Sequence, residues 1–260
     1  MADKDQFVLS EKRLENFHFC RYETEDLKLE PNYLHCMRQA VKYFHQQLLE
    51  ISALDEKRFN KRYFDIMLNG HKKASYKDST LGGKGMLRTT HLSALRPNAI
   101  AYAQHIARYF NLSQPMPGKV IINGVAEEDW PLNLRTGEHY YAHPRALKKY
   151  FESAGRTLLE YLHHMEEGNK ISQARKLIGE YYHTLINARP FGHVNNSLIM
   201  GQVNYLLLNT NHQGMLHGDL DHLFTRFDYS DAMEIWIKAL DGKLPIASEY
   251  GLDFQAKPTK

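Results

Sequence analysis

Apolar residues recur at three- and four-residue steps along most of the chain, a spacing that predicts amphipathic helices. The first such stripe follows Pro31, a residue that suits the first turn of a helix. Its members are Leu34, Met37, Val41, Phe44 and Leu48. These positions lie on one face of a helix, so the chain is expected to begin its packed core here.

The next two helices are expected on either side of a polar stretch. One should cover residues 55–68 and end at Asn69-Gly70, because asparagine and glycine end helices readily. Residues 70–90 are rich in glycine, lysine and hydroxyl residues and predict an exposed loop. A further helix should start at Pro97. Its apolar face consists of Ile100, Ala103, Ile106, Ala107 and Phe110.

Helical patterns continue through the C-terminal half. One stripe follows Pro144 and another follows residue 171, and both predict amphipathic helices. Their apolar members are Leu147, Phe151, Ala154, Leu158, Tyr161 and Met165 in the first, and Ala174, Leu177, Ile178, Tyr181 and Leu185 in the second. Residues 196–209 are largely apolar and predict a helix buried in the core. Ser230 is placed to cap a last helix that runs through Leu240.

Only one stretch predicts a strand. Residues 119–122 read Lys-Val-Ile-Ile, of which the last three are β-branched and apolar, and Asn123-Gly124 is a dipeptide typical of tight hairpin turns. Residues 125–143 carry no regular pattern. The expected fold class is therefore mainly α, with a small β-hairpin at 119–124.

Composition and net charge argue against some classes of protein but do not identify one. The chain has 260 residues, of which 43% are hydrophobic, and a net charge of +3. This charge is too small and too scattered to predict nucleic-acid binding, and no stretch is apolar for long enough to predict a membrane span. Two cysteines and a start without a signal-peptide core predict a cytoplasmic protein, with signal-independent export left open.

The loop between the helices from 171 and 196 has the chemistry of an anion site. The residue before Pro190 does not easily stay helical, so the first helix should end near Ala188 and Phe191 should be buried. Asn195 or Asn196 then caps the next helix, whose free amides at 194–197 would face the loop. The simpler interpretation is a connection between two core helices, in which the asparagines are caps only.

The stretch Arg189-Pro190-Phe191 to Ser197 resembles the signature of the Fic family, H-x-F-x-[D/E]-[G/A]-N-[G/K]-R. Pro190 and Phe191 match the Pro-Phe that commonly follows the histidine, and Asn195 matches the asparagine of the motif. The resemblance implies a Fic-like helical bundle. Members of the family usually transfer AMP, or another phosphate-bearing group, to a hydroxyl of a target protein.

Two further segments are similar to parts of that family. Gly85 to Thr89 is similar to an upstream G-x-x-R stretch, which would place Arg88 along one wall of the pocket. The hairpin at 119–124 resembles a flap that positions the target chain. The resemblance divides the chain into an N-terminal arm and helical extension at 1–84, a Fic-like core at 85–242 and a tail at 243–260, within one compact unit.

The chain departs from the motif at five positions. Arg189 replaces the histidine that acts as general base, and a guanidinium cannot take a proton. His193 replaces the acid that would hold Mg²⁺, and imidazole is a poor ligand for this cation. Val194 and Asn196 replace glycines, and Ser197 replaces an arginine that would grip a distal phosphate. Ordinary AMP transfer from Mg-ATP is therefore not expected.

A divergent transferase and an inactive binding module both fit this pattern. In the first, Arg189 clamps an anionic group, and His193 or His183 replaces the missing base, since histidine titrates near neutral pH. The predicted ligand-binding residues are Arg189, Asn195, Asn196, Ser197 and Arg88. The donor would be a nucleotide or another phosphate-bearing compound. In the second, the hairpin at 119–124 binds a protein partner by strand addition.

A third hypothesis concerns the densest group of metal-ligating residue types. Residues 217–222 read His-Gly-Asp-Leu-Asp-His, which contains two histidines and two aspartates. These residues could form the centre of a metal-dependent hydrolase. A polar turn between two helices explains the same spacing without any metal.

Overall fold

The chain is mainly helical, as its apolar pattern predicts. The computed structural model describes residues 31–51, 54–75, 83–90, 92, 97–113, 115, 120–131, 141–166, 170–216 and 218–245. Within these residues there are eight α-helices, two short 3₁₀-helices and no strand. No helix among them is long and apolar enough to cross a lipid bilayer.

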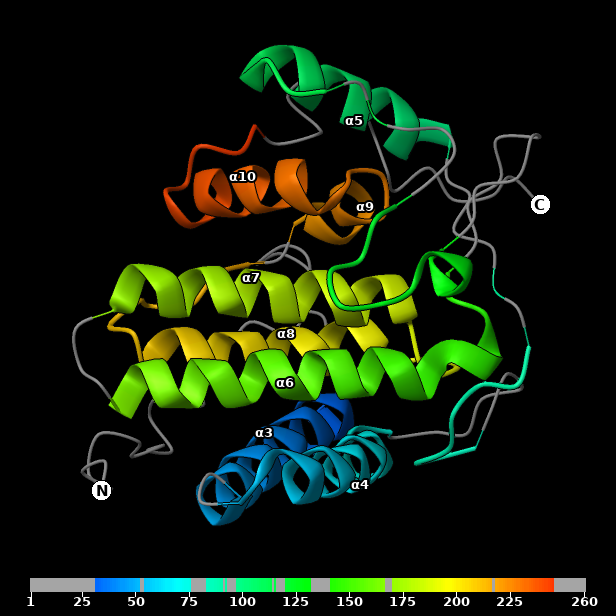
Figure 1. The fold of residues 1–260 in the computed structure, drawn as a ribbon, viewed down its shortest axis with the longest axis vertical. Helices are drawn as coiled ribbons and strands as arrows, with labels where there is room; N and C mark the ends of the chain where they lie inside the picture. Colours follow the sequence, from blue (N-terminus) through cyan, green and yellow to red (C-terminus); the bar gives the residue numbers. More distant parts are fainter. Residues whose placement is uncertain are drawn as a thin grey trace.

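Three helices form the middle layer of the molecule: α6 (Leu147–Glu166), α7 (Ile171–Ala188) and α8 (Asn195–Leu208) (Figure 1). Helix α7 packs against both α6 and α8. Eleven of the fourteen residues of α8 are buried, which confirms the prediction of a helix enclosed by the core. A helix in this position must be apolar on all sides because other elements cover each of its faces.

Two layers cover this centre. Helices α3 (Pro31–Ile51) and α4 (Glu56–Ala74) lie on one side, where α3 contacts α8 and α4 contacts α6 (Figure 1). Helices α9 (Leu220–Phe224) and α10 (Tyr229–Leu240) lie on the other side, and α10 packs on α7. The helices of the N-terminal extension thus share one hydrophobic core with the bundle.

The outermost helix, α5 (Pro97–Phe110), contacts α9. Two 3₁₀-helices, η2 (Glu127–Asp129) and η3 (Pro144–Ala146), lie in the chain between α5 and α6. The turn at Asn123-Gly124 leads into η2, and the apolar residues on either side of the turn, Val120, Ile122 and Val125, pack in a second, smaller cluster that also contains Tyr150 of α6 and Ala188 of α7. This small cluster surrounds the end of α7, where the predicted site begins.

Two helix boundaries differ from the prediction. Helix α4 does not stop at Asn69-Gly70 but continues to Ala74, because His71 and Ala74 extend its buried face. Tertiary burial outweighs the weak helix propensity of the Asn-Gly pair. Helix α10 is capped by Asp228, whose side chain accepts a hydrogen bond from the Asp231 amide, and not by Ser230.

The strand expected over 119–122 is absent from the part of this segment that is described, which begins at Val120. Val120 and Ile122 are both buried, each with 1% of its surface exposed, and Ile121 between them is only partly buried. The backbone turns at Gly124, which has a φ of 74°. No described segment pairs with these residues as a second strand, and the side chains pack on helices instead.

Candidate functional site

The predicted loop begins where α7 ends at Ala188, as expected from Pro190. Arg189 follows in the left-handed region with a φ of 39°, and its amide donates to the Leu185 carbonyl. A left-handed residue turns the chain sharply away from the helix axis. This conformation costs roughly 1–2 kcal/mol for a residue other than glycine, so the surrounding contacts must hold it in place.

Asn195 organises the loop from the first turn of α8. Its Oδ1 accepts a hydrogen bond from the Phe191 amide at 2.8 Å, and its Nδ2 donates to the Phe191 carbonyl at 2.7 Å. The same Nδ2 lies 3.3 Å from the His193 carbonyl oxygen. These bonds close the loop on itself.

The prediction that an asparagine caps α8 is wrong. Val194 occupies the cap position, and no side chain there accepts a hydrogen bond from the helix. The Asn195 side chain is turned back to Phe191 and is therefore unavailable as a cap. Val194 adopts a φ of 46°, a conformation that a β-branched residue rarely takes. The loop therefore stores backbone strain at both Arg189 and Val194.

Phe191 anchors the loop in the core, as predicted, with 0% of its surface exposed. Its ring stacks on the His71 ring of α4, with 4.0 Å between centroids and 3° between planes. The Phe151 ring of α6 also packs against the Phe191 ring, with 6.3 Å between the two centroids. The loop is thus fixed by two helices that lie far apart from it in the sequence.

His71 connects this anchor to the segment that carries Arg88. Its Nδ1 accepts a hydrogen bond from the Gly85 amide at 2.9 Å, and its Nε2 lies 3.2 Å from the Ser75 hydroxyl. The accepting Nδ1 requires the neutral ring with its proton on Nε2. Burial, and then the neighbouring His193, lower the pKa of His71 to about 4. The ring is therefore neutral near pH 7.

A pH dependence of stability follows from His71 and His183, because burial lowers the pKa of both from 6.5 to about 4. Below pH 6.5 the unfolded chain binds protons at these two positions that the folded chain does not bind. The contribution of these two histidines to the free energy of unfolding should therefore be fully present well above pH 6.5 and fall between pH 6.5 and 4, by at most about 1.4 kcal/mol per pH unit for each histidine.

Urea unfolding at a series of pH values measures this slope. The variants His71→Gln and His183→Gln should each reduce the slope in that pH range, whatever they do to the stability at pH 7. The exposed His143 provides the matched variant, His143→Gln, which should leave the slope unchanged. Equal slopes for the wild type and both buried-site variants would contradict the assignment.

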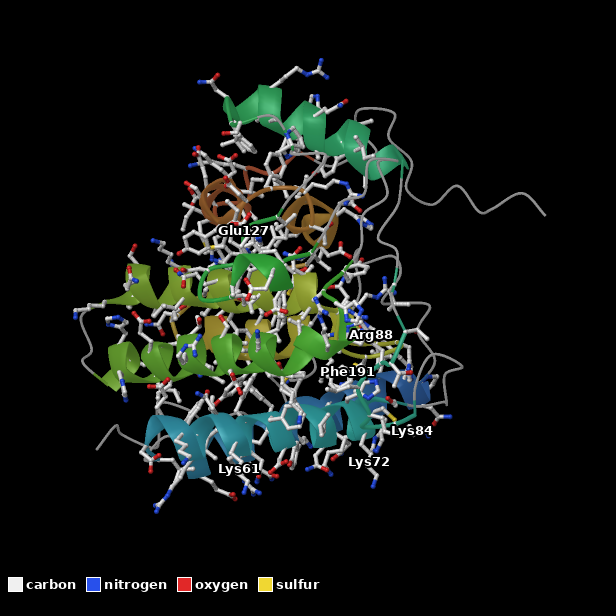
Figure 2. The ribbon with its side chains drawn as sticks, turned by 45° about the vertical axis from the view of Figure 1, so that its right-hand side comes forward. Lys61, Lys72, Lys84, Arg88, Glu127 and Phe191 are labelled. Atoms are coloured by element: carbon white, nitrogen blue, oxygen red, sulfur yellow. The ribbon has the colours of Figure 1, made fainter. Side chains whose placement is uncertain are left out.

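Arg88 lies behind the loop, and its side chain forms hydrogen bonds with main-chain carbonyls only. Its guanidinium donates to the carbonyls of Arg189 at 2.7 Å, Ala188 at 2.9 Å and Thr90 at 2.8 Å, and also to that of Ala142. Its amide donates to the Pro190 carbonyl at 2.9 Å. Arg88 and Phe191 lie at the same end of the bundle (Figure 2).

This placement differs from the expected one. Arg88 has 1% of its surface exposed and does not line the pocket described below, although residues 70–90 were expected to form an exposed loop. Burial and the nearby charge of Arg189 lower the pKa of Arg88 to about 10, which leaves it protonated near pH 7. Arg88 therefore neutralises the carbonyl end of α7 and holds the loop in position.

A pocket with a volume of about 320 Å³ opens at the junction of α7 and α8. It is lined by Tyr141, Ile186, Arg189, His193, Val194, Asn195, Asn196, Ser197, Asp221 and His222. Five of the residues predicted to bind the ligand or act as the base thus meet in one pocket: Arg189, His193, Asn195, Asn196 and Ser197. This volume is at the lower end of the range typical of small-molecule sites.

The Arg189 side chain is the principal cation of this pocket. Its guanidinium lies over the Tyr141 ring, with 4.8 Å from Cζ to the ring centroid. Tyr141 is itself held by a hydrogen bond from its amide to the Leu92 carbonyl at 3.1 Å. No carboxylate among the described residues forms an ion pair with Arg189. The stacked guanidinium is therefore held in position, and no carboxylate of the described residues neutralises it.

The first turn of α8 adds main-chain donors. The Leu198 amide is the first with a helical partner, the Val194 carbonyl at 3.1 Å. The amides of Asn195, Asn196 and Ser197 come before it, in residues that line the pocket. The Ser197 hydroxyl oxygen accepts a short hydrogen bond from the Tyr33 hydroxyl of α3. Its own proton therefore remains the group that can point to a ligand.

His183 is not brought into this pocket. It lies in α7 with 1% of its surface exposed, beside the Phe224 ring at 5.5 Å between centroids. Burial lowers its pKa to about 4, so it is neutral near pH 7. Of the two histidines predicted as a base, only His193 lies where it can reach a ligand.

Asp221 and His222 of α9 line the pocket, although the sequence suggested a separate role for them. The Asp221 carboxylate accepts a hydrogen bond from Asn196 Nδ2 at 2.9 Å, which attaches α9 to the start of α8. Sequence spacing alone could not reveal this, because about 25 residues separate the two side chains in the chain. The dense group of acids and histidines at 217–222 did draw attention to Asp221 and His222, but as part of a metal site and not of this pocket.

The metal hypothesis gains nothing from this arrangement. His217 lies outside the described residues, and no three histidine, cysteine, aspartate or glutamate side chains come together as a metal site within the described part of the chain. Asp221 and His222 line the pocket together with residues of the loop.

The fold and the pocket define a mainly helical protein with a small polar cavity at the junction of two central helices. Comparison of the chain with models of protein families and with characterised protein sequences gives no match. The function is accordingly inferred from the chemistry of the pocket.

Proposed function

We propose that the pocket formed by residues 189–197 binds a phosphate-bearing or other anionic ligand. The observation that carries this proposal is the Arg189 guanidinium, held on Tyr141 and unpaired by any described carboxylate, in the same pocket as the first amides of α8. Hydrogen bonds from a guanidinium to an anionic group are about twice as strong as neutral ones. The positive end of the α8 dipole favours the same charge.

The loop is preorganised for such a ligand. Asn195 closes it, Phe191 anchors it on His71, and Arg88 holds the carbonyls that precede it. A loop that is already ordered loses little conformational entropy on binding, so more of the interaction energy is available as affinity. Both strained residues, Arg189 and Val194, lie in this segment, and stored strain is common at binding sites.

We further propose a Fic-like fold and a non-standard transfer of a group to a hydroxyl. The support is the combination of the buried Phe191, the Asn195 bonds and the helix that follows. In this reaction the hydroxyl oxygen attacks the phosphorus, His193 accepts the hydroxyl proton, and the bond from phosphorus to the leaving group breaks. Arg189 stabilises the charge that develops on the phosphoryl oxygens.

Thermal unfolding with a ligand panel tests the binding proposal. The wild type and Arg189→Glu are compared with nucleotides, nucleotide sugars and simple phosphates, each with and without Mg²⁺. One ligand class should raise the unfolding temperature of the wild type, because a ligand that binds only the folded state stabilises it. At a concentration of about 100 times Kd the gain is roughly 2.7 kcal/mol, and Arg189→Glu should lose it.

Arg145→Glu is the matched control, since Arg145 is exposed and lies outside the pocket. It carries the same change of charge and should keep the ligand-induced shift. The ligand class found in this way is then used as the donor in a transfer assay of the wild type and His193→Ala. Transfer by the wild type that His193→Ala abolishes would support the enzymatic role.

A flat response of both proteins to every ligand would contradict the binding proposal. It would favour the alternative, a catalytically inactive Fic-like module that binds a protein partner at 119–124. In that case the partner is sought with the wild-type chain, and a substitution at Ile121, which is only half-buried, should weaken its capture.

A further inference from the structure

A groove with a volume of about 440 Å³ lies between α4 and α6 and shares no lining residue with the pocket at 189–197. Its floor is aromatic. Phe64 of α4 is half-buried and Phe151 of α6 is 2% exposed, and their rings meet edge to face with 5.4 Å between centroids. A floor of this kind suits a large apolar side chain of a ligand.

Four basic side chains surround this floor, and all four are exposed. Three of them are lysines, called here the groove lysines: Lys57 and Lys61 of α4 and Lys148 of α6. None of the groove lysines forms an ion pair with a described carboxylate. The fourth basic residue is Arg156 of α6. The groove lysines therefore offer their charges to a ligand that carries anionic groups.

The basic residues are spread along the groove. A Cβ at Gly155 would lie 2.3 Å from Asn60 Oδ1, and Phe151 contacts Phe64, so α4 and α6 run in opposite directions here. Residues 57 and 65 mark the two ends of the α4 side, and at 1.5 Å per residue they are about 12 Å apart along the helix axis. A ligand that reaches cations at both ends must therefore be elongated.

The polar residues of the lining favour negative groups that are separated from one another. Asn60 Oδ1 is buried against Gly155, so Nδ2, a donor, is the polar atom of this side chain that can face the groove. Asp65 and Glu152 also line the groove, which leaves a formal excess of two positive charges. These two carboxylates oppose a densely charged polyanion or a uniformly negative surface.

We infer that this groove binds an acidic peptide segment of a protein partner. A large apolar side chain of the segment packs on Phe64 and Phe151, and carboxylates on either side of it pair with the groove lysines. An extended peptide advances about 3.3 Å per residue, so about four residues cover the 12 Å of the groove. Recognition of a peptide in a groove between helices, with an apolar anchor, is a common mode of binding.

The groove adjoins the turn at Asn123-Gly124. Arg156 Nη2 donates to the Gly124 carbonyl at 3.3 Å, and the Ser153 hydroxyl donates to the Asn123 carbonyl at 3.0 Å. A partner bound in the groove would therefore lie beside the segment at 119–124 that the sequence predicts as a partner-binding surface. The inference goes beyond the anion site and does not depend on it, because the two sites have no residue in common.

Fluorescence anisotropy with labelled peptides of defined sequence tests this inference. The peptides carry phenylalanine, leucine or alanine at the centre, flanked on both sides by acidic residues, by serine or by lysine. The acidic phenylalanine or leucine peptide should bind the wild type about tenfold more tightly than the acidic alanine peptide and than either apolar peptide with lysine flanks. Binding should weaken between about 0.05 and about 0.5 M NaCl, because salt screens exposed ion pairs.

The double variant Lys57→Glu/Lys61→Glu should weaken binding of the acidic phenylalanine peptide by about tenfold or more, because two attractive contacts become repulsive. Lys72→Glu is the matched control. Lys72 is exposed and lies on the same helix as Lys61 but outside the groove (Figure 2), so its variant should keep the wild-type affinity. Circular dichroism of each variant confirms that it is folded.

Phe64→Ala tests the floor of the groove separately from its charges. This variant should reduce the preference for a central phenylalanine over alanine to about twofold or less. It should retain the preference for acidic over lysine flanks, because the groove lysines remain. A preference for phenylalanine that persists in full would place the apolar side chain elsewhere and contradict the inference.

Other outcomes would also overturn the inference. It is wrong if the acidic peptides bind no better than those with serine or lysine flanks, or if the double variant binds them as the wild type does. Sedimentation with phosphatidylserine vesicles that the double variant abolishes, without peptide binding, would assign the groove to a lipid surface. Self-association that the double variant abolishes, measured by analytical ultracentrifugation, would assign it to a second copy of the chain. The ligand panel for Arg189 measures the anion site independently of these results.

Discussion

Replacement of Arg88 by alanine should lower the free energy of unfolding by about 3–5 kcal/mol. The guanidinium bonds four main-chain carbonyls, of which those of Ala188 and Arg189 end α7 and begin the loop. Without it, buried carbonyl groups lose their charged donor and a cavity remains at a site that is 1% exposed. Urea unfolding, followed by circular dichroism at the helix band, measures the loss.

Arg88→Lys should recover little of this stability, since one ammonium cannot reproduce the forked donors of a guanidinium. Arg58→Ala is the matched control. The Arg58 side chain is 79% exposed and pairs with Asp55 on the surface, so its removal should change the stability by less than about 0.5 kcal/mol. If Arg88→Ala unfolds at the same urea concentration as Arg58→Ala, the structural role of Arg88 is wrong.

Replacement of Gly179 by alanine should destabilise the protein by about 2–3 kcal/mol, although alanine is the better helix former. A Cβ at this position in α7 would lie 2.5 Å from Cδ1 and 2.6 Å from Cγ of Trp236. The indole cannot move away easily, because it is fully buried in α10 and its Nε1 donates to the Arg175 carbonyl at 2.7 Å. The α7–α10 contact therefore requires glycine.

Gly70→Ala provides the matched control and should have the opposite effect. Gly70 is also a helical, buried glycine, but the nearest atom to its added Cβ would be Leu198 Cδ1 at 3.9 Å, an ordinary contact. The substitution should stabilise the protein by about 0.5–1 kcal/mol through helix propensity. Thermal unfolding should place the two variants on opposite sides of the wild type, and a stable Gly179→Ala would contradict the close packing of α7 on α10.

The Arg88 prediction bears on function as well as on stability. Three sets of contacts hold the loop at 189–197 in position. They are the hydrogen bonds from Arg88, the hydrogen bonds of Asn195 within the loop, and the stacking of Phe191 on His71. None of these three groups needs to touch a ligand to affect its binding. A variant of Arg88 that remains folded should therefore weaken binding by disordering the loop, whereas a variant of Arg189 should weaken binding without a large loss of stability.

The helices could be predicted because the signal for each is local. Stripes of apolar residues at helical spacing mark α3, α5, α6 and α7, and Pro190 marks the end of α7 at Ala188. The burial of Phe191 followed from the same reasoning. The pattern was less reliable at the ends of α4 and α10 and at Val120 to Ile122. At the end of α4 and at Val120 to Ile122, tertiary contacts outweigh weak local preferences, whereas at α10 a neighbouring residue, Asp228, caps the helix in place of Ser230.

Part of the site could also be predicted from local sequence patterns. Arg189, His193 and the residues of the first turn of α8 are close in sequence, so a loop followed by a helix start is enough to bring them together. Asn195 belongs to the same local stretch, and its side chain forms hydrogen bonds with Phe191, four residues earlier. These residues could be assigned to one site from the sequence because they lie close together along the chain.

The rest of the site depends on contacts between segments that are distant in sequence. Arg88 was expected along one wall of the pocket and lies buried behind the loop, where it bonds the carbonyls of Ala188 and Arg189, about 100 residues away in the sequence. His183 lies in α7, the helix that leads into the loop, but its side chain is buried in the core. Asp221 belongs to α9 and lines the pocket. Chain patterns specify which helices form and which of their faces are apolar. The polar groups that meet at the ends of those helices are set by how the helices pack, because packing angle and register place side chains that no local pattern relates.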